Sequence, residues 1–118
     1  MTVTTAEILE EAGQILADPT AWLQGRYSNG AALGASWYGG EPQQLAEATC
    51  FCSLGAIREA YRRRGIPING DANSAAWALE DVGTVGSVNE WNDHPDRQHS
   101  EIVEMFRKAR DYAIENGL

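Results

Sequence analysis

The hydrophobic and polar positions of this 118-residue chain follow a helical period over most of its length. Near the start, Ile8, Ala12 and Ile15 recur at spacings of four and three residues, which places them on one face of a helix. Asp18-Pro19 ends this run, because the residue before a proline avoids the α region. The pattern predicts a first helix over residues 5–17.

The most continuous apolar stripe of the chain comes near its middle and predicts a helix that begins at Ala48 or Cys50 and ends at Arg64. The stripe covers so much of the helix circumference that we expect this helix to be central. Gly55 lies inside it, where glycine costs about 1 kcal/mol relative to alanine. We expect the close approach of another backbone segment to compensate for that cost.

Three further stretches complete the helical pattern. A short helix is expected near residues 43–45. A longer one begins at a cap within residues 71–74 and ends before Gly83. The last helix is predicted over residues 98–116, and Asn116-Gly117 is a natural C-terminal cap.

Residues 25–42 interrupt the helical pattern with five glycines, which predict a glycine-rich loop or a short β-hairpin. Few strand-type alternations occur elsewhere. The fold class we expect is therefore all-α: a compact bundle of three to five helices in a single domain over residues 1–118.

Composition narrows the class of protein. Apolar residues make up 43% of the chain and charged residues 22%, which is typical of a globular protein. No apolar run approaches the roughly 20 residues of a membrane span, and the N-terminus lacks the pattern of a secretion signal. Two cysteines do not form a disulfide framework. We therefore expect a cytoplasmic location and no membrane contact.

The formal net charge is −8, which argues against a direct nucleic-acid binder because such a protein needs a basic face. An acidic surface suits docking on a basic partner. The one basic island, Arg58 with Arg62, Arg63 and Arg64, is interpreted as cations at a helix C-terminus, and contact with an anion or an acidic peptide is the alternative. Phosphate-loop and dinucleotide fingerprints do not occur in the sequence.

Cys52 is a candidate nucleophile, because a thiol at a helix N-terminus gains thiolate character. His94 or His99 would then act as the base, and Asn92 or Asp93 would orient that base. The competing interpretation is a small buried side chain on a tightly packed helix, which is how free cysteine usually behaves.

Metal binding by Cys50, Cys52, His94 and His99 is not favoured by their spacing. Two residues that are two positions apart on a helix point roughly 200° apart, so the two thiols cannot chelate one ion there. We expect no metal and no cofactor.

The segment Trp91-Asn92-Asp93-His94-Pro95-Asp96-Arg97 is the better site candidate. Its polar residues can form Asx-turns, and Arg97 can pair with Asp93 or Asp96, which is a purely structural interpretation. The alternative is a recognition loop, because Trp and Arg are enriched at interface hot spots. The candidate binding residues are Trp91, Asn92, Asp93, Arg97, Trp37 and Tyr38.

Three motifs resemble those of a family of small uncharacterised proteins, a domain of unknown function frequent in actinobacteria and their phages. They are Trp22-Leu23-Gln24-Gly25, the stretch from Phe51 to Ala56, and Trp91 to Arg97. Phe51 stands where a tryptophan is usual, and Gln98 stands where a capping threonine is usual. The resemblance implies one compact helical unit and carries no assigned activity.

The sequence favours a small acidic protein that acts by binding rather than by catalysis, as a regulatory or accessory factor. Its partner would be a protein or a small-molecule ligand held by the Trp91–Arg97 segment, and the resemblance implies an association with phages or mobile elements. Two alternatives stay open: a cysteine-dependent hydrolase or transferase with Cys52 as nucleophile, and an acidic mimic of nucleic acid that occupies a basic cleft.

Overall fold

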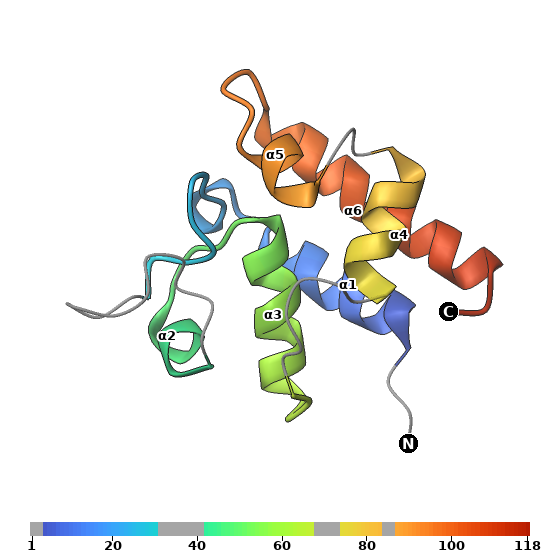
Figure 1. Cartoon of the computed structure of the whole chain (residues 1–118), viewed down its shortest axis with the longest axis horizontal. Coiled ribbons are helices and arrows are strands. Elements are labelled where there is room, and N and C mark those ends of the chain that lie inside the picture. Colours follow the sequence, from blue (N-terminus) through green and yellow to red (C-terminus); the bar gives the residue numbers. More distant parts are fainter. Residues whose placement is uncertain (1–3, 31–41, 68–73, 84–86) are drawn as a thin grey trace.

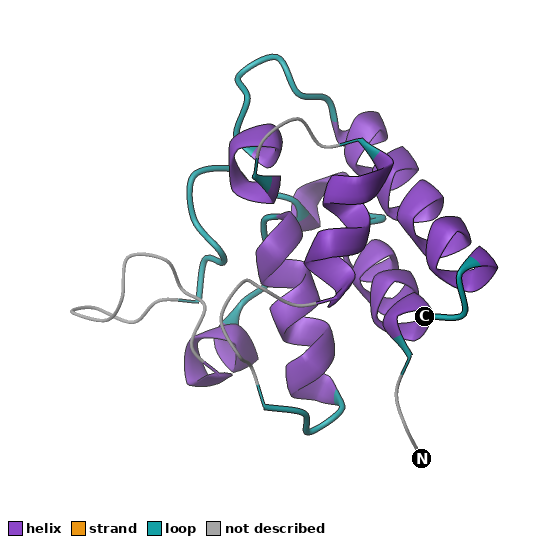
Figure 2. Cartoon of the chain, turned by 45° about the vertical axis from the view of Figure 1, so that its right-hand side comes forward, coloured by secondary structure: helices purple, strands orange, loops and turns teal. Residues whose placement is uncertain are grey.

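A computed structural model of the chain describes residues 4–30, 42–67, 74–83 and 87–118. Within these ranges the fold is all-α, as expected (Figures 1 and 2). The helices are α1 (Thr5–Ile15), α2 (Pro42–Glu47), α3 (Ser53–Arg63), α4 (Ser74–Val82), α5 (Val88–Asn92) and α6 (His99–Glu115), and a 3-10 turn spans Pro19–Ala21. The short helix α5 falls in a region for which the sequence predicted no helix.

Four helices share one core. α1 packs against α6 and α3, and α4 packs against α6, so that these four helices surround most of the core, to which α2 and α5 add Leu45 and Val88. Figure 1 shows α2 on the far side of α3 from α4 and α6, and α5 above α3. The fully buried large side chains are Ile8, Leu9, Leu16, Leu45, Ile57, Leu79, Val88, Ile102 and Phe106. The apolar faces found in the sequence are thus the ones that meet.

α1 begins and ends close to its predicted bounds. The Thr4 hydroxyl accepts a hydrogen bond from the Glu7 N–H at 3.1 Å, which satisfies one of the free donors of the first turn. At the other end of the chain, the Leu118 carbonyl accepts a hydrogen bond from the Ala6 N–H at 3.4 Å. The end of the chain after α6 therefore lies beside the first turn of α1.

α3 starts later than the sequence predicted. Cys52 is its N-cap, and Phe51 lies in an extended segment instead of in the helix. The Phe51 N–H donates to the Ala21 carbonyl at 2.7 Å, and the Leu23 N–H donates to the Phe51 carbonyl at 3.0 Å. These bonds form isolated β-bridges with the segment after the 3-10 turn and use the backbone groups that a longer helix would need.

Gly55 faces the close backbone approach that its position predicted. A Cβ added there would lie 1.8 Å from the Tyr27 carbonyl oxygen, so no side chain fits. The same carbonyl accepts a hydrogen bond from the Cys52 N–H at 3.1 Å. The chain segment around Tyr27 is therefore held directly against the first turn of α3.

The predicted glycine-rich loop or hairpin of residues 25–42 falls mostly on residues 31–41, which lie outside the described ranges. Its described start, residues 25–30, runs beside residues 49–52. Asn29 anchors it there, because its side-chain oxygen accepts from the N–H groups of Thr49 and Cys50 at 2.8 and 3.1 Å. Nowhere in the described ranges is a helix both long and apolar enough to cross a bilayer.

Candidate functional site

The three motifs singled out in the sequence meet at the side chain of Asn92, which is 0% exposed. Its Oδ1 accepts hydrogen bonds from Trp22 Nε1 at 2.9 Å, from the Ser53 N–H at 3.0 Å and from the Ser53 hydroxyl at 2.7 Å. Its Nδ2 donates to the Leu23 carbonyl at 3.1 Å and to Asp93 Oδ1 at 2.9 Å. One buried amide therefore joins α5, the start of α3 and the segment after Ala21.

Gln24 and Gly25 extend this contact along the chain. Gln24 Nε2 donates to the carbonyls of Asn92 and His94, both at 2.8 Å. The Gly25 N–H donates to Asp93 Oδ1 at 2.9 Å. We call this set, Trp22 to Gly25 with Ser53, Asn92 and Asp93, the Asn92 junction. Buried polar groups are costly unless they are hydrogen-bonded. The junction therefore holds α5, the start of α3 and the segment after Ala21 in one relative arrangement.

Trp91 and Asn92 end helix α5 and do not lie in a loop, contrary to the prediction. The Ser87 hydroxyl caps α5 by accepting from the Glu90 N–H at 3.1 Å. Asn92 points into the protein, with both ends of its amide bonded internally. The polar loop that the sequence predicted is thus confined to residues 93–98.

Trp91 is 8% exposed and supports the side chain of Arg97. The guanidinium carbon lies 4.2 Å from the centroid of the Trp91 ring, a cation–π geometry. Arg97 Nε donates to the Trp91 carbonyl at 2.9 Å, and its Nη1 donates to Glu101 Oε2 at 2.9 Å. Arg97 therefore pairs with Glu101 and not with Asp93 or Asp96.

A groove of about 370 Å³ runs along α6 beside this stack. It is lined by Trp91, Arg97, Ser100, Glu101, Glu104, Met105 and Lys108. Its walls combine an aromatic ring, a thioether and charges of both signs. This mixture suits the recognition of a polar chain with apolar side chains. We call it the α6 groove.

Two carboxylates of the α6 groove are held in their charged form. The N–H of Gln98 donates to Glu101 at 2.8 Å, and together with the guanidinium of Arg97 it lowers the pKa of the Glu101 carboxyl. The ion pair with Arg107 lowers the pKa of Glu104. At the start of α6, the Glu101 carboxylate reaches back and bonds to the Gln98 N–H, as in a capping box.

Cys52 is buried and caps its own helix. Its Sγ accepts from the Gly55 N–H at 3.4 Å and lies 4.0 Å from Asn89 Oδ1. The thiol lines a small cavity of about 40 Å³ with Asn89 and Asp93, and neither histidine contributes to that lining. The cavity has room for about one water molecule, not for a substrate.

The two histidines have partners of their own. His99 Nε2 lies 2.6 Å from the Leu16 carbonyl oxygen, which assigns the proton to Nε2, and its ring centroid is 6.2 Å from that of Trp22. His94 Nδ1 accepts from the Asp96 N–H at 3.1 Å. Within the described residues, no group of three or more His, Cys, Asp or Glu side chains gathers where a metal ion could bind. The other two candidate binding residues, Trp37 and Tyr38, lie outside the described ranges.

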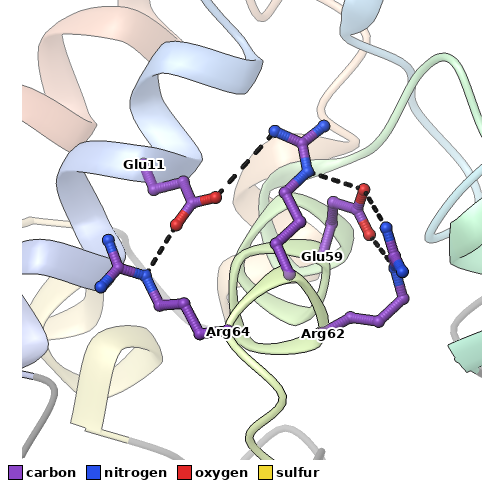
Figure 3. A network of polar contacts seen from close by, with 5 residues as sticks. Glu11, Glu59, Arg62 and Arg64 are labelled. Atoms are coloured by element: carbon purple, nitrogen blue, oxygen red, sulfur yellow. Dashed lines mark hydrogen bonds and ion pairs between the residues drawn. The ribbon is translucent and has the colours of Figure 1, made fainter.

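Three arginines of the basic island pair with acidic side chains of the same protein (Figure 3). Glu59 accepts from Arg62 Nε at 2.5 Å and from Arg63 Nε at 2.9 Å, and Arg64 Nε donates to Glu11 at 2.7 Å. We call this set the α3 charge network. Arg58 lies over the Tyr27 ring, 4.8 Å from its centroid. The C-terminal cations of α3 therefore tie it to α1 as well as complementing its dipole.

Sequence reasoning found the residues of the Asn92 junction only in part. It treated Asn92 and Asp93 as loop residues, and it gave Gln24 and Ser53 no role. Nothing in the local pattern of the sequence indicates that these distant segments meet, because their contacts are made by single polar side chains.

The fold and the junction define a small all-α protein whose sequence motifs build its own framework. The chain matches the model of a family of unknown function, DUF6197, over residues 1–112, and it belongs to that family. No curated protein and no solved structure gives a significant match.

Proposed function

We propose that the protein is a non-catalytic binding factor that holds a partner protein in the α6 groove. The observation that carries the proposal is the stack of Arg97 on Trp91 at the wall of this groove. Trp and Arg are the side chains most often found at interface hot spots. Hydrogen bonds hold Arg97 in place and burial holds Trp91, so little conformational freedom is lost when a partner binds.

On this proposal, the candidate binding residues have two kinds of role: some contact the partner, and others hold the framework in place. Arg97 would contact the partner directly, and Trp91 would support the guanidinium of Arg97 from below. Asn92 and Asp93 would act through the framework by holding α5 in place. A regulatory or accessory role, and an association with phages or mobile elements, are extensions of the same proposal.

Site-specific photocrosslinking tests the proposal. A benzophenone amino acid at Ser100, an exposed residue of the groove, should crosslink one partner protein in cells that naturally express the chain. The Lys108→Glu substitution, which reverses a charge of the groove, should remove that product. The same crosslinker at Glu115, exposed on α6 outside the groove, is the matched control. Equal crosslinking from both positions would contradict the proposal.

Alkylation separates this function from the cysteine-dependent alternative. A buried Cys52 should react slowly with iodoacetamide at mildly acidic pH in the folded protein and rapidly after unfolding. Fast modification of Cys52 in the folded protein would contradict the binding proposal and favour a cysteine-dependent hydrolase or transferase.

A further inference from the structure

Trp77 lies on the solvent-facing side of α4 and is not among the residues that line the α6 groove. Its side chain is 58% exposed, whereas the neighbouring Ala75, Ala76, Ala78 and Leu79 are buried against the rest of the protein. A tryptophan normally removes a large apolar area from water. In α4, more than half of the Trp77 side chain is exposed to solvent, while the opposite face of the helix is buried.

Two acidic residues follow Trp77 on the same side of α4. Glu80 and Asp81 are exposed and follow Trp77 by three and four residues, which places them one helical turn away on the same side of α4. The hydroxyl of Tyr112 on α6 donates to Asp81 Oδ2 at 3.2 Å. This bond holds the Asp81 carboxylate in place through one of its two oxygens. We call Trp77, Glu80, Asp81 and Tyr112 the α4 face.

We propose that the α4 face binds an arginine-rich segment of a basic partner protein, with one guanidinium stacked on the Trp77 ring and bonded to Asp81. The ring presents negative π density, and the two carboxylates add full negative charge beside it, so a cation is attracted from both directions. The net charge of −8 adds a long-range attraction for a basic partner.

Arginine fits this face better than lysine. A guanidinium is planar, so it can lie flat on the indole while its edge donates to a carboxylate oxygen. An ammonium group is a compact, strongly hydrated charge that gains less from stacking. A purely apolar partner would leave Glu80 and Asp81 without compensation in the buried interface.

The α4 face and the α6 groove are independent proposals. They share no side chain, although both include residues of α6, so the loss of one interaction leaves the other measurable. A variant at Trp77 should leave crosslinking from Ser100 unchanged.

Anisotropy of a fluorescein-labelled oligo-arginine peptide at low ionic strength provides the test. Trp77→Leu, which keeps apolar area but removes the π system, should weaken binding about three- to fivefold. Trp77→Phe should fall between Trp77→Leu and the wild type. Asp81→Asn should weaken binding by a similar factor, and an oligo-lysine peptide should bind less tightly than oligo-arginine.

Two matched controls separate a specific face from general attraction between opposite charges. Ile114 is 61% exposed on α6, so Ile114→Ala removes an equally exposed apolar side chain. Glu115→Gln removes one exposed carboxylate elsewhere. Both should leave the affinity unchanged. The proposal is overturned if the oligo-arginine peptide does not bind, if Trp77→Leu binds as the wild type does, or if Glu115→Gln costs as much as Asp81→Asn.

Discussion

The two ends of α3 use polar side chains in opposite ways. At its N-terminus, Ser53 meets the neutral amide of Asn92, and both are fully buried. At its C-terminus, the α3 charge network joins the buried Glu59 carboxylate to arginines that remain partly in water, including Arg63, whose side chain is 45% exposed. A buried neutral bond is costly to break, whereas an exposed ion pair exchanges readily with solvent. The N-terminal end should therefore determine stability.

The largest effect is expected at Gly55. Replacing it with alanine would place a Cβ 1.8 Å from the Tyr27 carbonyl oxygen. Neither atom can move away by a side-chain rotation, because the oxygen belongs to the backbone and the Cβ is attached directly to it. We expect Gly55→Ala to lower the free energy of unfolding by about 3 kcal/mol or more, measured by chemical denaturation.

Gly13→Ala is the matched control, because Gly13 also lies inside a helix. Its added Cβ would meet Phe106 at 3.4 Å, and alanine improves helix propensity by about 1 kcal/mol. The stability of this variant should stay close to that of the wild type. Equal stability of the Gly55→Ala and Gly13→Ala variants would show that Tyr27 does not pack on α3.

The next effect concerns the Asn92 junction. Asn92→Ala leaves the donors of Trp22 and Ser53 buried without their acceptor, which should cost about 3 kcal/mol in chemical denaturation. Asn89→Ala, a substitution at a half-buried asparagine in the same helix, should cost about 1 kcal/mol or less. If the two substitutions cost the same, Asn92 is not the centre of the contact.

A smaller effect is expected in the α3 charge network. The Glu59 side chain is 4% exposed and accepts from two arginines, so Glu59→Gln should cost about 1–2 kcal/mol. Glu7, whose side chain is 51% exposed, pairs with Arg64 at 3.1 Å, and Glu7→Gln should cost well under about 1 kcal/mol. Urea denaturation in low and high salt tests both. A larger loss for Glu7→Gln would reverse our ranking of these two contacts.

The long helices were predictable from the sequence. The first helix was placed at residues 5–17 and runs over Thr5–Ile15, and the last was placed at 98–116 and runs over His99–Glu115. Both carry several turns of apolar periodicity, which determines a helix locally. Gly55 was predictable for a different reason, because an interior glycine in a strong helical pattern needs a compensating contact.

The candidate site was harder to predict, because its geometry depends on contacts between distant segments. α5 has only five residues, too few for a periodic signal. Asn92 is a residue type that favours turns, and only its bonds to Trp22 and Ser53 explain why it is buried at the end of a helix. The start of α3 was placed too early for the same reason, since Phe51 pairs with a segment that the sequence pattern does not reveal.

Two carboxylates of α6 differ in what holds them: Glu101 is held chiefly by a backbone N–H, and Glu104 chiefly by a side chain. The pKa of Glu101 is lowered chiefly by the backbone N–H of Gln98 and secondarily by Arg97, whereas that of Glu104 is lowered chiefly by Arg107. Arg97→Gln should therefore raise the pKa of Glu101 only part of the way to its ordinary value, because the Gln98 N–H remains. Arg107→Gln should bring the pKa of Glu104 most of the way back to its ordinary value. NMR titration of the side-chain carboxyl carbons measures both.

The sign of the pH dependence follows from the same shifts. A carboxyl whose pKa is lower in the folded state stabilises the protein above its unfolded pKa, and this contribution disappears as the pH falls through the folded value. Removing Glu101 with Glu101→Gln should therefore make stability fall less steeply on acidification below about pH 4. Full recovery of the Glu101 pKa in Arg97→Gln would mean that the side chain, not the backbone, holds this carboxylate. The first turn of α6 would then depend on an ion pair, as the C-terminus of α3 does, and not on a backbone hydrogen bond.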